Sequence, residues 1–167
     1  VYKRQSLMPT NLYGTGDNYH EINSHVLASF IRKFSEAVEF KRENVTCWGS
    51  GLVYREFLHC DDLGDACRFV LETWDPSLDS SPKKNNGDIL DYLNVGTGID
   101  LTIKDLAELI AKLVNYKGQI TWDKSKPDGT LKKQLNISRI EKLGWNPKII
   151  LEEGIKQAIN DYKKRNF

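Results

Sequence analysis

The sequence predicts an α/β fold in which short strands alternate with amphipathic helices. Apolar residues recur at intervals of three and four over residues 24–38 and 102–114, which is typical of helices with one buried face. Runs rich in β-branched and aromatic residues at 45–48 and 54–59 are typical of strands. The 167 residues are 40% hydrophobic and 28% charged, as in a single soluble globular domain.

Three strands and two helices are expected in the first half of the chain. The elements expected there are strands at 6–13, 45–48 and 54–59 and helices at 24–38 and 62–74. Short polar side chains accept hydrogen bonds from the first backbone N–H groups of a helix. We therefore expect Asn23 or Ser24 to cap the first helix, and Asp61 or Asp62 to cap the second.

The second half begins with a polar segment, residues 75–88, that is rich in Pro, Ser, Asn and Lys and lacks periodicity. An exposed, mobile loop is expected there. The elements expected after it are strands at 89–95 and 117–122 and helices at 102–114, 138–143 and 151–162. Thr102 and Asp105 match part of a capping box, residues 124–130 form a polar turn, and Gly144 ends the short helix.

Composition excludes several classes of function. Lys and Arg total 24 against 23 acidic residues, and a net charge of +1 argues against binding to nucleic acid or to an anionic membrane. No apolar run reaches the ~18 residues of a membrane span, and no signal peptide opens the chain. Cys47, Cys60 and Cys67 are odd in number and lack C-x-x-C spacing, so we expect free thiols in the cytoplasm and no metal site.

The first five residues do not look like part of the natural sequence. Residues 1–5, V-Y-K-R-Q, resemble a translated sequencing adapter, and the chain then enters a strand directly. We therefore expect the natural sequence to occupy residues 6–167 and to be a fragment of a longer protein.

Residues 48–63, W-G-S-G-L-V-Y-R-E-F-L-H-C-D-D-L, hold the densest group of functional residue types. Gly49 and Gly51 would let the backbone approach a ligand closely, and Arg55 has the rigid fork of donors that suits a phosphate. The same residues would also suit an ordinary hairpin followed by a capped helix. Residue types alone leave both interpretations open.

Four side chains together form a plausible site for a nucleoside diphosphate that carries sugar hydroxyls. They are Lys33, Trp48, Arg55 and Asp128. Cations bind phosphates, an aromatic face stacks on a base, and a carboxylate accepts hydrogen bonds from hydroxyls. Taken singly, three of them have ordinary alternatives: Lys33 as a solvated lysine, Trp48 as a core residue and Asp128 as a turn former.

His25 stands at the start of the first long helix, where an imidazole could shuttle a proton. A capping or surface histidine is the alternative, and His20 and His59 are weaker candidates. Residues 96–98, G-T-G, precede a helix but lack the third glycine of a dinucleotide-binding loop, so they suit a tight turn.

Seven motifs carry a family resemblance from residue 6 to the end. They are P-T-N-L-Y-G (9–14), D-N-Y-H (17–20), N-S-H-V (23–26), W-G-S-G (48–51), R-E-F-L-H-C-D-D (55–62), N-V-G-T-G (94–98) and S-K-P-D-G-T (125–130). Together they resemble the GDP-L-fucose synthases, a family of extended short-chain dehydrogenases/reductases. The resemblance implies the C-terminal part of such an enzyme, with the last Rossmann strands and the smaller α/β substrate-binding domain.

The resemblance also implies an activity and a set of site residues. Family members convert GDP-4-keto-6-deoxy-D-mannose to GDP-L-fucose by 3,5-epimerisation and 4-reduction with NADP(H), and a homodimer is expected. His25 would be catalytic and would also contact the cofactor. The cofactor's nicotinamide side would be lined by Pro9, Thr10, Asn11 and Leu12. The GDP-sugar would be bound by Lys33, Trp48, Arg55 and Asp128.

The family's catalytic Ser, Tyr, Lys and Cys match no residue of this chain, so we expect the chain alone to be inactive. Two alternatives are another nucleotide-sugar epimerase or dehydratase of the extended family and a non-catalytic module that binds a GDP-sugar.

Overall fold

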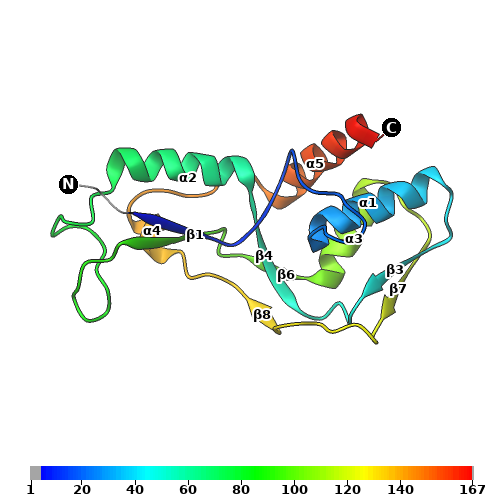
Figure 1. The fold of residues 1–167 in the computed structure, drawn as a ribbon, viewed down its shortest axis with the longest axis horizontal. Helices are drawn as coiled ribbons and strands as arrows, with labels where there is room; N and C mark the ends of the chain where they lie inside the picture. The colour runs from blue at the N-terminus through cyan, green and yellow to red at the C-terminus, as the bar shows by residue number, and fades with distance from the viewer. Residues whose placement is uncertain (1–4, 167) are drawn as a thin grey trace.

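Strands and helices alternate along an elongated molecule, which confirms the predicted α/β class (Figure 1). The computed structural model describes residues 5–166, so four of the five adapter-like residues, 1–4, lie outside the described residues. The helices are α1 (Val26–Glu39), α2 (Cys60–Thr73), α3 (Ile103–Leu113), α4 (Ser138–Lys142) and α5 (Leu151–Asn166). The strands are β1 (Ser6–Pro9), β2 (Asn11–Tyr13), β3 (Asn44–Trp48), β4 (Tyr54–His59), β5 (Tyr92–Val95), β6 (Asp100–Thr102), β7 (Gln119–Asp123) and β8 (Lys132–Lys133).

The strand expected at 6–13 is divided at Thr10 into β1 and β2. β1 pairs in parallel with β5, whereas β2 pairs in parallel with β4. The N–H of Thr10 donates to the carbonyl of Val95 at 3.0 Å, and its hydroxyl donates to the carbonyl of Glu56 at 3.3 Å. The chain therefore changes partner at this residue and joins two sheets.

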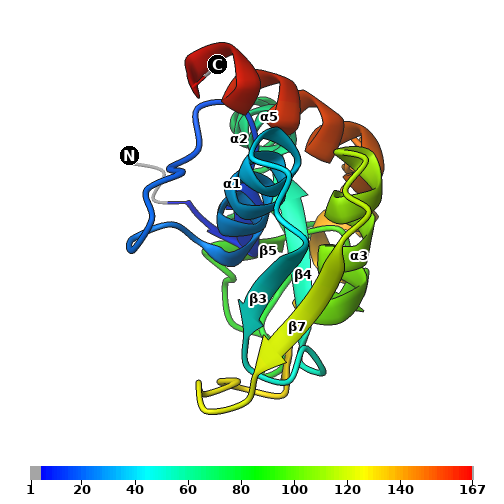
Figure 2. The same cartoon turned by 90° about the vertical axis from the view of Figure 1, so that its right-hand side faces the viewer.

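β4 is the central strand of the molecule. It pairs in parallel with β2 and β8 and antiparallel with β6, and β3 pairs in parallel with β7. Figure 2 faces the end of the molecule at which β3 lies beside β7. The sequence did not predict β6 and β8, because strands of two or three residues are too short to display a period-two pattern.

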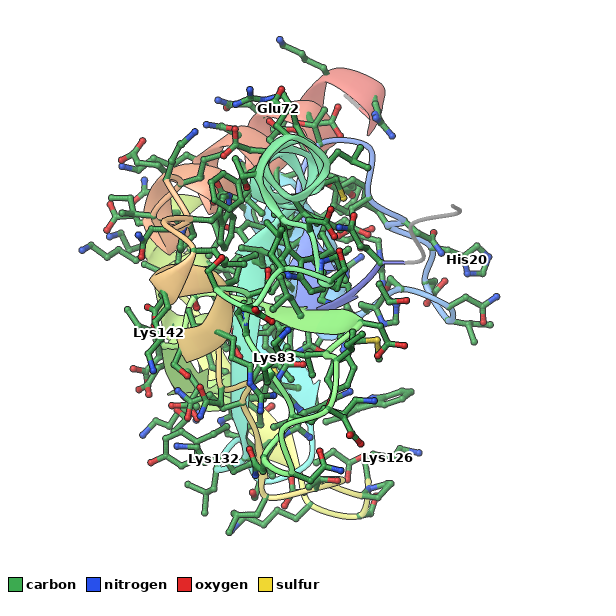
Figure 3. All side chains as sticks on the ribbon, turned by 90° about the vertical axis from the view of Figure 1, so that its left-hand side faces the viewer. His20, Glu72, Lys83, Lys126, Lys132 and Lys142 are labelled. Atoms are coloured by element: carbon green, nitrogen blue, oxygen red, sulfur yellow. The ribbon has the colours of Figure 1, made fainter. Side chains whose placement is uncertain are left out.

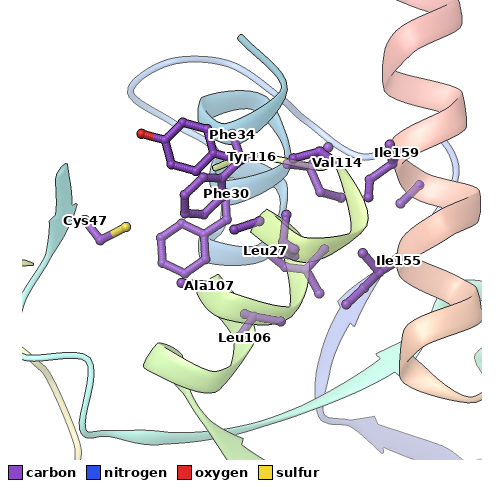
Figure 4. Packing of buried hydrophobic residues seen from close by; sticks show 14 of the residues in the cluster. Leu27, Phe30, Phe34, Cys47, Leu106, Ala107, Val114, Tyr116, Ile155 and Ile159 are labelled. Atoms are coloured by element: carbon purple, nitrogen blue, oxygen red, sulfur yellow. The ribbon is translucent and has the colours of Figure 1, made fainter. Parts of the chain in front are cut away.

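Two hydrophobic cores lie on either side of β4 (Figure 1). The first packs α1, α3 and α5 together and against β3, and Phe30 and Phe34 of α1 stand near its centre (Figure 4). The second lies among α2, α4 and β5 and includes Trp74 and Trp145. Neighbouring residues of β4 point to opposite faces, so Phe57 enters the first core and Leu58 enters the second.

Two of the three predicted helix caps are wrong. α1 begins after His25, which makes no side-chain capping bond, so neither Asn23 nor Ser24 has the cap position. α2 begins at Cys60, and the Nδ1 atom of its cap residue, His59, accepts the N–H of Asp61 at 3.2 Å.

Asp62 has turned inward, which explains why it does not cap α2. Its two carboxylate oxygens accept the N–H groups of Lys148 and Ile149, each at 3.0 Å, and so hold the segment that leads into α5. The capping box of α3 is confirmed, because Thr102 and Asp105 exchange hydrogen bonds between side chain and backbone.

The segment 75–88 forms turns with mostly exposed residues, although Ser81 is buried. Lys83 forms an isolated antiparallel bridge with Ile89, and β5 starts three residues later than the expected position 89. Among residues 5–166 no helix has both the length and the apolar character needed to cross a membrane.

Candidate functional site

A pocket of about 700 Å³ opens between α1, the β3–β4 connection and the loop that follows β7. Of the nine site residues predicted from the sequence, seven line it: Asn11, Leu12, His25, Lys33, Trp48, Arg55 and Asp128. Pro9 and Thr10 do not line it. The structure therefore brings residues from five separate stretches of sequence to one cavity.

The two glycines of W-G-S-G make room for protein side chains. Gly49 and Gly51 have φ angles of 81° and 76°, which favour glycine. A Cβ atom at Gly49 would collide with Oδ1 of Asp128, and one at Gly51 would lie 2.8 Å from the ring of Trp122. These glycines therefore let β7 and the loop after it close against the β3–β4 connection, and Gly51 also lines the pocket.

Asp128 is held at the pocket wall by this close approach. The backbone N–H of Ser50 donates to its Oδ1 atom at 2.6 Å, and hydrogen bonds from Ser50 hold the pKa of Asp128 below its usual range. The carboxylate is therefore ionised at neutral pH. An ionised carboxylate can accept hydrogen bonds from sugar hydroxyls or from the N–H groups of a base.

Arg55 ties two segments of the pocket together. Its Nη1 atom donates to the carbonyl of Tyr54 at 2.6 Å and to the carbonyl of Thr130 at 2.7 Å, so β4 is joined to the loop after β7. The guanidinium has five donors, and those on its other nitrogens can still serve a phosphate. The sequence predicted the phosphate role but not this positioning role.

Trp48 presents an exposed ring at the mouth of the pocket. It is 64% exposed, which excludes the core position considered from the sequence. The Nζ atom of Lys33 lies 5.8 Å from the ring centroid and donates to the carbonyl of Thr46 at 3.1 Å. An exposed indole beside an ammonium group can stack on a base while the cation attracts its phosphates.

His25 stands exposed at the pocket wall, where α1 begins. The segment before it is fastened to α5, because Asp161 accepts the N–H of Gly16 at 3.0 Å and Tyr19 donates its hydroxyl to the carbonyl of Ala158 at 3.0 Å. Burial raises the pKa of Tyr19, so its hydroxyl remains a donor. His20 lies at the edge of the molecule, away from its body (Figure 3).

Glu56 binds three backbone segments together beside the pocket, a role that the sequence analysis did not predict. Its side chain is completely buried. Its Oε1 atom accepts the N–H groups of Thr97 and Gly98 at 2.6 and 2.8 Å, and Oε2 accepts that of Leu135 at 2.8 Å. A Cβ atom at Gly96 would collide with this carboxylate, which explains the first glycine of residues 94–98. An acidic residue between apolar positions of a central strand was the available signal.

Of the residues predicted to bind the cofactor, Asn11, Leu12 and His25 line the pocket, whereas Pro9 and Thr10 do not. Thr10 and the side-chain amide of Asn11 both donate to the carbonyl of Glu56, the amide at 2.7 Å, so their polar atoms stabilise the strand junction. Asn11 and the exposed Leu12 line the pocket. The sequence has no G-x-G-x-x-G loop for the phosphates of a dinucleotide.

Comparisons with known proteins match both sequence and fold. The profile of the NAD dependent epimerase/dehydratase family matches residues 3–86. A GDP-L-fucose synthase of Escherichia coli K12 is 46% identical over 155 residues, which are 90% of this chain and 46% of the relative. A putative GDP-L-fucose synthase 2 of Arabidopsis thaliana is 44% identical over 93% of this chain and 43% of the relative. The chain thus spans less than half the length of these curated relatives.

Solved structures of GDP-sugar reductases share the fold. A GDP-6-OMe-4-keto-L-xylo-heptose reductase from C. jejuni has a TM-score of 0.83 at 32% identity, over 97% of this chain and 54% of that one. A GDP-mannoheptose C4 reductase from Campylobacter jejuni with NADP bound has a TM-score of 0.78 at 30% identity, over 95% of this chain and 52% of that one.

Proposed function

The chain belongs to the NAD dependent epimerase/dehydratase family, and from this premise we propose that it forms the GDP-sugar-binding part of a GDP-L-fucose synthase. The parent enzyme would convert GDP-4-keto-6-deoxy-D-mannose to GDP-L-fucose by 3,5-epimerisation and NADPH-dependent 4-reduction. The observation that carries the proposal is the single pocket that gathers Lys33, Trp48, Arg55 and Asp128. The names of the similar proteins from E. coli and Arabidopsis support the choice of substrate.

The four side chains match the parts of a GDP-sugar. Lys33 and Arg55 would bind the diphosphate, since both are cations at the pocket wall. Trp48 would stack on the base with its exposed ring. Asp128, whose pKa is lowered, would accept hydrogen bonds as a carboxylate from the sugar or the base.

His25 would move protons at the sugar. The protons on C3 and C5 of the substrate are acidic because both carbons are α to the 4-keto group. An exposed imidazole at the pocket wall can accept or return such a proton. Asn11, Leu12 and His25 would line the nicotinamide end of the cofactor. When bound, NADPH supplies the hydride that reduces C4.

In the complete enzyme, the His25→Gln variant should lose more of its epimerisation rate than of its affinity for NADPH. Incorporation of solvent deuterium at C3 and C5 measures the first property, and fluorescence titration with NADPH measures the second. Equal deuterium incorporation in the variant and the wild type would remove His25 from the proton transfer.

The binding proposal is tested directly on this chain by calorimetry. GDP-L-fucose should bind. UDP-glucose should bind at least about tenfold more weakly, because a site built for a GDP-sugar discriminates guanine from uracil through the side chains that contact the base. Preference for a UDP-sugar would favour another nucleotide-sugar enzyme of the family. Absence of binding to any nucleotide sugar would contradict the proposal.

We further propose that the chain binds without turnover, because it has no Y-x-x-x-K pattern to supply the family's catalytic Tyr and Lys. NADPH oxidation with GDP-4-keto-6-deoxy-D-mannose as substrate should therefore stay at the background rate, and measurable oxidation would refute this point. A homodimeric parent protein in the cytoplasm remains part of the proposal, and sedimentation of the complete protein tests the dimer.

A further inference from the structure

We propose that Lys126 is a further substrate-binding residue of this pocket, whose ammonium group binds the diphosphate and favours nucleoside diphosphates over uncharged nucleosides. The inference rests on the proposed GDP-sugar site and adds to it a residue of the S-K-P-D-G-T motif to which the sequence analysis gave no role. Lys126 lies on the loop between β7 and β8, directly before Pro127 and Asp128, which line the pocket.

Lys126 and Lys33 share one aromatic ring. The Nζ atom of Lys126 lies 5.4 Å from the centroid of Trp48, and that of Lys33 lies 5.8 Å from it. Both are within the ~6 Å over which an aromatic ring attracts a cation. Because the ring is mostly exposed, the two ammonium groups concentrate positive charge at the pocket mouth.

The ammonium group of Lys126 has more unused hydrogen-bond donors than that of Lys33, and as many as the guanidinium of Arg55. Lys33 donates to the carbonyl of Thr46, and Nη1 of Arg55 donates to two backbone carbonyls. Within the described range 5–166 the ammonium group of Lys126 lies over the ring of Trp48 and donates no side-chain hydrogen bond, while its charge helps to lower the pKa of the nearby Asp123. All three of its donors can therefore serve an incoming phosphate.

The loop holds the base of this side chain in place while its tip can move. The backbone N–H of Lys126 donates to the carbonyl of Asp123 at 3.2 Å, and Asp128 accepts from Ser50 on the opposite segment. The four-carbon stem of a lysine rotates freely, and Lys126 extends at the edge of the molecule (Figure 3). A base that stacks on Trp48 would displace the ammonium group from the ring and place it near the diphosphate of the same nucleotide.

The test compares Lys126→Met with Lys124→Met by calorimetry on this chain, using GDP and guanosine as ligands. Methionine keeps an unbranched stem but removes the charge, and Lys124 is an exposed lysine of the same loop. Lys126→Met should weaken GDP binding about tenfold and guanosine binding less than about threefold, since only GDP carries phosphate charge. Lys124→Met should bind both ligands like the wild type, and Lys126→Arg should recover most of the GDP affinity.

The outcomes separate this inference from the function on which it rests. Unchanged GDP affinity in Lys126→Met overturns the inference and leaves the proposed function standing, provided that the wild type binds GDP. Equal losses for GDP and guanosine also overturn it, because Lys126 would then act on Trp48 or the base. Failure of the wild type to bind GDP contradicts both proposals. Circular dichroism of each variant verifies that the fold is retained.

Discussion

The two sides of β4 have different architectures. On one side, three helices pack around the first core, whose aromatic residues include Phe30, Phe34 and Tyr116. On the other side, the two-stranded sheet of β1 and β5 packs against α2 and the short α4. The pocket lies on the first side and takes its walls from α1, β2, β4 and the loops around β3 and β7.

This difference shows that the pocket depends on a helix that is firmly packed on its other face. The wall that carries His25 and Lys33 belongs to α1, whose other face is buried against α3 and α5. The long helix of the second side, α2, contributes no residue to the pocket, whereas the shared strand β4 contributes Arg55 and Phe57. The packing of α1 therefore fixes the positions of His25 and Lys33, while the second side supports the shared strand β4.

The largest expected effect comes from the first core. Phe34→Ala should lower the free energy of unfolding by about 4 kcal/mol, because it removes a completely buried aromatic ring and leaves a cavity. Urea denaturation followed by tryptophan fluorescence measures the change. Val38→Ala, on the exposed side of α1, is the matched control, and a similar loss for both variants would contradict the assignment of this core.

Glu56→Gln tests the connection between the two sides. An amide cannot accept hydrogen bonds on both of its heavy atoms, so one of the three backbone donors would lose its acceptor, and we expect a loss of about 3 kcal/mol. Glu72→Gln on the exposed face of α2 should change stability by less than about 0.5 kcal/mol. Equal stability of the two variants would show that the buried carboxylate does not join the sides.

Arg55→Ala tests the pocket itself. It should weaken GDP-L-fucose binding by about 2 kcal/mol, since it removes a charge-assisted contact and frees the loop after β7 from β4. Calorimetry measures the affinity, and Lys132→Ala on the neighbouring strand serves as a control. Unchanged binding in Arg55→Ala would exclude Arg55 from the site.

Thr102→Ala should cost about 1 kcal/mol of stability, because it removes the side chain that caps α3. Ser138→Ala is the comparison on the second side, where the short α4 has no side-chain cap, and it should be nearly neutral. Thermal unfolding of both variants measures the difference, and an equal shift in midpoint would contradict the role of the capping box.

Thiol reactivity distinguishes the two sides without a mutation. Burial raises the pKa of Cys47, in the first core, to about 11, so its thiol stays neutral and unreactive until the pH approaches that value. Cys67 is exposed on α2. Mass spectrometry after brief treatment with iodoacetamide at pH 8 should find Cys67 alkylated and Cys47 intact. Rapid alkylation of Cys47 would mean that the first core opens readily.

The sequence predicted the α/β class and the helices α1, α3 and α5, because apolar periodicity records which face of a helix is buried. It did not predict the division of β1 from β2 at Thr10, because strand pairing depends on partners far along the chain. The family resemblance carried by the motifs is confirmed by the relatives and by the matching family profile.

The site was predicted in its residue types more completely than in its contacts. Seven of nine expected residues line one pocket, whereas their roles in binding remain predictions. The sequence did not reveal that Glu56 is buried or that Arg55 holds the loop after β7, because residue type does not encode which backbone groups lie within reach. Both facts depend on segments brought together from distant parts of the chain.

The attachment of the His25 segment to α5 also has a consequence for the order of folding. Gly16 and Asp161 are separated by 145 positions, and Tyr19 and Ala158 by 139, so this end of the pocket wall is synthesised long before the α5 residues that anchor it. Contacts between such distant residues form late and slowly. During synthesis on the ribosome, the histidine therefore acquires its final position only after α5 has emerged and docked.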